Sequence, residues 1–191
     1  MSILIAGLVV FFAVHSVSIF NEPWRDSMVA RLGEWPWKGV YSMAAIIGFV
    51  LIVWGYGLAR VDPVVLYSPP IWLRHVSILI LVPVFPLLLA AYLPGRIQAI
   101  TRHPMLVATK LWAVAHLLAN GTLADVLLFG SFLVWAVIDR ISMKRRTQRL
   151  IPAAPPSKFN DIVAVLFGLV LYTAFVLWLH AWLIGVPPTA G

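Results

Sequence analysis

Long apolar stretches, separated by short segments rich in proline, glycine or charge, run along the whole chain. A helix needs about 20 apolar residues to cross the hydrocarbon core of a membrane, and this pattern predicts six spans. They are residues 2–20, 39–59, 71–93, 105–120, 122–139 and 161–185. The sequence therefore predicts an all-α protein, a polytopic membrane helical bundle with about six transmembrane helices, in a single domain over residues 1–191.

Two details of this pattern allow finer predictions. Pro83 and Pro86 lie inside the third span, where we expect a kink that releases backbone carbonyls to a neighbouring group. Residues 21–38, between the first two spans, are expected to form a loop that contains Glu22 and Glu34.

The composition supports a membrane protein and limits its chemistry. Only 11% of the residues are charged, under half of the roughly 25% found in soluble domains. The chain has no cysteine, which excludes disulfides, Cys-ligated metals and covalently attached c-type haem. Its five histidines and five methionines remain as nitrogen and soft ligands.

The net charge of +7 is explained by membrane topology. Loops 1, 3 and 5 share one side of the predicted membrane, and with Lys110 they account for twelve of the 14 Lys and Arg residues. The opposite side has only Arg60 and Arg74. Because cytoplasmic loops carry the excess of Lys and Arg, we expect an inner-membrane protein with both termini in the periplasm and no nucleic-acid partner.

Two histidines in apolar surroundings are the candidate metal ligands. His116 shares one helical face with Trp112 and Asn120, near the middle of the fourth span, and His15 follows two phenylalanines in the first. Their expected depths in the membrane are compatible. Two neutral imidazoles with aromatic walls suit a haem b, so the predicted metal ligands are His15 and His116. Hydrogen bonding between helices is the alternative role for each histidine.

The remaining polar residues define a rim and several alternatives. Arg102 is expected on the cytoplasmic side, where with Arg96 and Lys110 it could receive haem propionates, and His103 lies beside it, directly before Pro104. His75 and His180 are expected near the outer face, and with His103 they are supporting or alternative ligands.

No catalytic residue can be assigned from the acidic side chains. No glutamate follows residue 34, so the paired carboxylates of acid–base catalysis are missing. Asp139 is expected to pair with Arg140 or Lys144. The segment DRISMKRRTQR (139–149) is expected to lie against anionic headgroups, with a phosphate-bearing ligand as the alternative.

The chain resembles the NnrU family of bacterial membrane proteins over nearly its whole length. The matching stretches are LVVFFAVHSVSIF (8–20), KGVYSMAAIIGFVLIVWGY (38–56), PPIWLRHVSILILV (69–82), RHPMLVATKLWAVAHLLANG (102–121), DVLLFGSFLVWAVIDRISMKRR (125–146) and LHAWLIGV (179–186). This resemblance implies a role in denitrification, through the expression or activity of nitrite and nitric oxide reductases.

Parts of the chain are also similar to the plant 15-cis-ζ-carotene isomerases, which are membrane enzymes with haem b. That resemblance implies haem ligation by His15 in VHS and by His116, thirteen residues after the histidine of RHP. The RHP motif is shared with isoprenylcysteine and phospholipid methyltransferases as well. Their downstream glutamate pair is absent here, so methyl transfer is disfavoured.

The sequence therefore favours a haem b-binding membrane protein linked to denitrification. It would carry out redox or isomerase-type chemistry on a hydrophobic small molecule, or sense nitric oxide. A non-enzymatic accessory factor for the expression or assembly of nitrite and nitric oxide reductases is the alternative, and solute transport is disfavoured because no span carries a charged pathway. The sequence leaves open whether the protein is an enzyme.

Overall fold

The computed structural model describes residues 1–147, 149 and 152–188, and this part of the chain is helical without a strand. The all-α prediction is confirmed. The chain forms two compact units. Unit 1 comprises Met1–Leu66 and Thr122–Gln148, and unit 2 comprises Tyr67–Gly121 and Arg149–Gly191. Each unit is thus built from two separate stretches of the chain, and the single domain over residues 1–191 stays a prediction.

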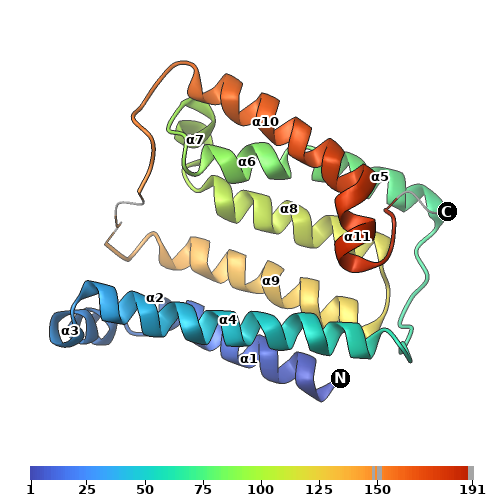
Figure 1. The fold of residues 1–191 in the computed structure, drawn as a ribbon, viewed down its shortest axis with the longest axis horizontal. Coiled ribbons are helices and arrows are strands. Elements are labelled where there is room, and N and C mark those ends of the chain that lie inside the picture. Colours follow the sequence, from blue (N-terminus) through green and yellow to red (C-terminus); the bar gives the residue numbers. More distant parts are fainter. Residues whose placement is uncertain (148, 150–151, 189–191) are drawn as a thin grey trace. The chain divides into compact units, whose positions relative to one another are not determined.

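Unit 1 is organised around two helices whose backbones approach closely at glycines. Its helices are α1 (Ser2–His15), α2 (Val17–Phe20), α3 (Glu22–Leu32), α4 (Glu34–Ala59) and α9 (Leu123–Ser142) (Figure 1). A Cβ atom added to Gly55 of α4 would lie 2.2 Å from the backbone nitrogen of Leu4 in α1, and one added to Gly7 would lie 2.6 Å from that of Ile52. Small residues therefore set the distance between α1 and α4.

Helix α3 occupies the segment that was expected to be a loop, so that prediction is wrong. The Asn21 side chain accepts a hydrogen bond from the Trp24 backbone N–H at 3.0 Å, and Pro23 lies in the first turn. Both features favour the start of a helix. Gly33, at φ 88°, ends it in a conformation that other residues rarely adopt.

Unit 2 contains the remaining helices. They are α5 (Ile71–Leu81), α6 (Val84–Ala90), α7 (Arg96–Thr101), α8 (Pro104–Ala119), α10 (Asn160–Ala174), the π-helix η1 (Phe175–Leu179) and α11 (His180–Ile184) (Figure 1). Val84 and Leu87 of α6 pack with Ala108 of α8 in its apolar core. Helix α8 begins at Pro104, as expected for a proline in a first helical turn.

The predicted kink in the third span is confirmed, because the helix breaks between α5 and α6 at Pro83. The backbone N–H of Val82 donates to Leu79 at 3.2 Å, in place of the α-helical bond to Ile78. The Ile78 carbonyl instead accepts the Tyr172 hydroxyl of α10 at 2.8 Å. The proline break thus frees a backbone acceptor that a neighbouring helix satisfies.

Among the described residues, three helical segments are long and apolar enough to cross a membrane: Glu34–Ala59, Ile71–Ala90 and Asn160–Ile184. Ser2–His15 and Pro104–Ala119 are apolar but shorter. These helices indicate a membrane protein and are compatible with a lipid bilayer. The count of about six spans stays a prediction.

Replacing Gly55 by alanine tests the close approach of α1 and α4. The added methyl group would overlap the α1 backbone, so we expect Gly55→Ala to lower the stability by about 1–3 kcal/mol. Gly57→Ala is the matched control in the same helix, since a Cβ there meets nothing within 4 Å. Thermal unfolding in detergent, followed by tryptophan fluorescence, measures both variants. Equal transition temperatures for the two would contradict the proposed packing.

Candidate functional site

His15 is the last residue of α1, and its tautomer is fixed by the helix that carries it. Its Nδ1 lies 2.7 Å from the backbone oxygen of Phe11. Because a carbonyl oxygen only accepts hydrogen bonds, Nδ1 carries the proton and a neutral His15 has its lone pair on Nε2. Histidines that bind metals are oriented by this kind of bond from the other ring nitrogen.

Aromatic rings surround His15 within unit 1. Phe11 stacks on the imidazole with ring centroids 4.0 Å apart, while Tyr41 and Trp135 approach it edge-on at 5.4 and 6.0 Å. The Trp135 indole nitrogen is buried and has no hydrogen-bond partner among the described residues. A buried donor without a partner costs about 1–3 kcal/mol, so this position suits an additional acceptor.

His116 of α8 has the same arrangement in unit 2. Its Nδ1 donates to the Trp112 backbone oxygen at 2.8 Å, and the Trp112 ring lies 5.2 Å from the imidazole. The Asn120 side-chain amide donates to the His116 backbone oxygen at 3.0 Å. The structure thus brings Trp112, His116 and Asn120 together. His116 lies in the last turn of α8, and its expected depth near the middle of the membrane stays a prediction.

The His180 ring lies 6.5 Å from that of His116, with planes inclined by 26°. The sequence did not predict this proximity, and the expected position of His180 near the outer face stays a prediction. A metal held between two imidazoles, with bonds of about 2 Å, separates their centres by roughly 6 Å. The His180 Nδ1 lies 2.5 Å from the Val186 oxygen, so its Nε2 also carries the lone pair of the neutral ring.

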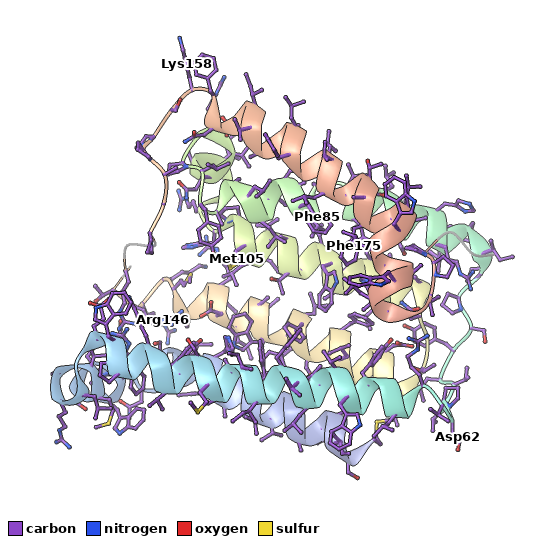
Figure 2. The ribbon with its side chains drawn as sticks, viewed as in Figure 1. Asp62, Phe85, Met105, Arg146, Lys158 and Phe175 are labelled. Carbon is purple, nitrogen blue, oxygen red and sulfur yellow. The ribbon has the colours of Figure 1, made fainter. Side chains whose placement is uncertain are left out.

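The helix before His180 is irregular and aromatic. The π-helix η1 ends at Leu179, and such turns are frequent at functional sites. Phe175 of η1 lies 5.9 Å from His180 and 5.4 Å from Phe85 of α6, and Figure 2 labels this phenylalanine pair. His180 therefore also lies beside an aromatic ring, that of Phe175.

Arg102 and His103 lie at the opposite end of α8 from His116. Arg102 has φ 61°, an uncommon conformation for a residue with a side chain, and His103 directly precedes the helix. Thirteen residues separate His103 from His116, about 20 Å along a helix. The structure therefore does not bring Arg102 and His103 to the His116 ring.

Asp139 pairs with Arg146, so the expectation of Arg140 or Lys144 is wrong. The Arg146 guanidinium donates to Asp139, and the exposed fractions of the two side chains are 16% and 8%. The chain turns back after α9, because the backbone N–H groups of Arg145 and Arg146 both donate to the Ser142 carbonyl, at 2.9 and 3.1 Å. This turn brings Arg146 over the end of the helix.

These observations define an all-helical membrane protein with imidazole and aromatic clusters inside it. Comparison with protein families identifies it further: the chain belongs to the NnrU family, whose model matches residues 3–188. Membership of this family fits a membrane protein related to denitrification. No curated protein and no solved structure matches the chain significantly.

The ion pair of Asp139 and Arg146 can be tested by a double-mutant cycle. Removing one partner leaves the other charge largely buried, so Asp139→Asn and Arg146→Gln should each destabilise the protein by about 3 kcal/mol. The double variant should lose clearly less than the sum of both, because it leaves no unpaired charge. Chemical unfolding in detergent measures the cycle. Additive losses would show that the two side chains do not interact.

Proposed function

We propose that this protein binds haem b in the inner membrane through His15 and His116, and that the haem supports its role in denitrification. The proposal rests on the tautomer of both histidines, that is, on which ring nitrogen carries the proton. Each donates Nδ1–H to the carbonyl four residues earlier, at 2.7 and 2.8 Å, which presents the unprotonated Nε2 as a ligand.

The surrounding residues fit a haem group by their chemistry. The rings of Phe11, Tyr41 and Trp135 on His15, and of Trp112 on His116, offer the apolar contact area that a macrocycle needs. The buried Trp135 N–H suits an acceptor on the group or on a molecule bound to it. Asn120 positions His116 by its bond to the backbone. Arg102 and His103 are left out because of their distance along α8 from His116.

His180 is the competing second ligand. It lies in the same unit as His116, and their stacked rings, with centroids 6.5 Å apart, are within reach of one shared metal. His15 is favoured by the sequence resemblance, and His180 by this distance. Experiment must therefore decide whether His15 or His180 is the second ligand beside His116.

A bound haem b supplies one-electron chemistry and a site for diatomic gases such as nitric oxide. We propose redox or isomerase-type chemistry on a hydrophobic small molecule, or sensing of nitric oxide, as the use of the haem. The second candidate is a non-enzymatic factor that supports the expression or assembly of nitrite and nitric oxide reductases. Membership of the NnrU family favours this accessory factor as much as the haem protein, because the family fits a denitrification-related protein and does not specify the chemistry.

The visible spectrum of the purified protein tests haem binding. We expect a Soret band in the oxidised form and a shifted band after reduction with dithionite. His116→Ala should abolish or shift the band, because this residue belongs to both proposed pairs. Loss on His15→Ala with retention on His180→Ala would identify the first pair, and the reverse result the second.

His75→Ala is the matched control, since this exposed histidine of α5 belongs to neither pair. Its spectrum should equal that of the unmodified protein. A colourless protein that takes up no haem when supplied with it would refute the haem proposal and favour the accessory factor.

The proposed topology places both termini in the periplasm, on the basis of the Lys and Arg count. Because the chain has no cysteine, a single introduced cysteine reports its own location. Ser68→Cys, in the segment between α4 and α5, should react with a membrane-impermeant maleimide once the outer membrane is permeabilised. Ser157→Cys, before α10, should react only after the cells are lysed. Both positions are exposed, and the reverse pattern would invert the topology.

A further inference from the structure

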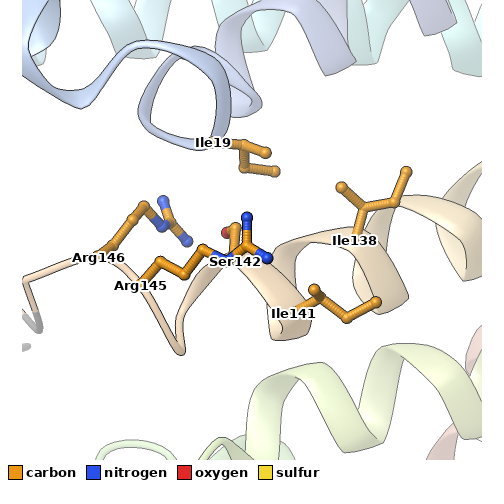
Figure 3. Close-up of a pocket in the computed structure, with 6 residues that line it drawn as sticks. All are labelled: Ile19, Ile138, Ile141, Ser142, Arg145 and Arg146. Atoms are coloured by element: carbon orange, nitrogen blue, oxygen red, sulfur yellow. The ribbon is translucent and has the colours of Figure 1, made fainter.

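A pocket of about 300 Å³ lies where α2 faces the end of α9, within unit 1. Figure 3 shows its lining, which combines apolar and cationic side chains. The six residues are Ile19, Ile138, Ile141, Ser142, Arg145 and Arg146. Its volume is at the lower end of the range for small-molecule sites, enough for a headgroup but not for a whole lipid.

The positive charge of this pocket comes mainly from Arg145. Arg146 is paired with Asp139, so these two charges compensate each other. Arg145 is exposed and has no ion-pair partner within the described part of the chain. The Ser142 hydroxyl already donates its proton to the Asp139 carbonyl at 2.9 Å, which leaves the guanidinium of Arg145 as the main donor for a ligand. A ligand of this pocket therefore needs an anionic group that can accept hydrogen bonds from a guanidinium.

An apolar stripe continues from the pocket along α9. Val134, Val137, Ile138 and Ile141 follow the spacing of one helical face, and each is between 42% and 58% exposed. A free phosphate ion would gain nothing from contact with this apolar stripe, whereas an acyl chain can lie along it. A basic group at the end of an apolar helix is the arrangement by which membrane proteins bind anionic lipids.

We propose that this pocket binds the phosphate of an anionic phospholipid, with Arg145 as the principal cation and the stripe on α9 as the seat of an acyl chain. Arg146 lines the pocket in an orientation fixed by Asp139. None of the six lining residues belongs to the rings around His15, and the proposal does not require that the protein binds haem.

Native mass spectrometry of the whole protein in detergent, titrated with phosphatidylglycerol, tests this site. We expect one lipid that binds more tightly than any others, and binding about fivefold weaker in Arg145→Gln, as follows from the loss of one interfacial cation. Lys144→Gln is the matched control, because it removes the same charge from the adjacent residue, which does not line the pocket. Its binding should change less than twofold. Equal weakening in both variants would overturn the site in favour of unspecific attraction to the basic segment.

Two further arms distinguish a lipid from a free anion. Ile141→Ser should weaken phosphatidylglycerol binding severalfold, because it interrupts the stripe. Inorganic phosphate at millimolar concentration should fail to displace the lipid. Displacement by inorganic phosphate, together with an unchanged affinity of Ile141→Ser, would overturn the lipid assignment. Equally tight binding of phosphatidylcholine would overturn the requirement for an anionic lipid.

Discussion

The structure depends on one constraint, that buried polar groups of an apolar chain must find partners within the chain because lipid offers none. His15 and His116 satisfy it by donating to carbonyls of their own helices. The carbonyl released at the Pro83 break satisfies it by accepting the Tyr172 hydroxyl. Asp125 of α9 satisfies it at the other end of that helix, where Tyr56 and Thr122 donate to its carboxylate. Polar side chains thus fix the geometry of helices that apolar contacts alone leave free to slide.

The same constraint makes the exceptions informative. Within the described part of the chain, Trp135 keeps a buried indole N–H without a partner, and its ring lies beside the His15 imidazole. The Nε of Arg146 is the other buried nitrogen without a partner among the described residues. A free donor beside an imidazole is the feature on which the proposed cofactor site rests. The pocket at the end of α9 is a different kind of exception, because its charge faces outward and its walls are apolar. The proposed cofactor site and the proposed lipid site would therefore differ in kind, since one is lined by aromatic rings and imidazole and the other by isoleucines and arginines.

The sequence predicts local features well, because local rules determine them. The break at Pro83 and the start of α8 at Pro104 follow from the geometry of proline. Helix α3 was missed although Asn21, Pro23 and Gly33 carry its boundary signals, because a polar segment between apolar spans resembles a loop. The partner of Asp139 depends on a turn after the helix, and the approach of His180 to His116 depends on tertiary packing near a π-helix. Neither leaves a signal in the order of the residues.

The two units are interleaved along the chain, and this has a consequence for biosynthesis. Residues 67–121 of unit 2 are translated between the two parts of unit 1, and unit 1 is completed only when α9 follows. Unit 2 in turn waits for α10, which supplies both the Tyr172 hydroxyl and the neighbour of Pro86 at Gly168. During synthesis the carbonyl at Ile78 therefore leaves the ribosome long before its donor. Insertion of α5 and α6 must therefore tolerate an unsatisfied acceptor until α10 is made.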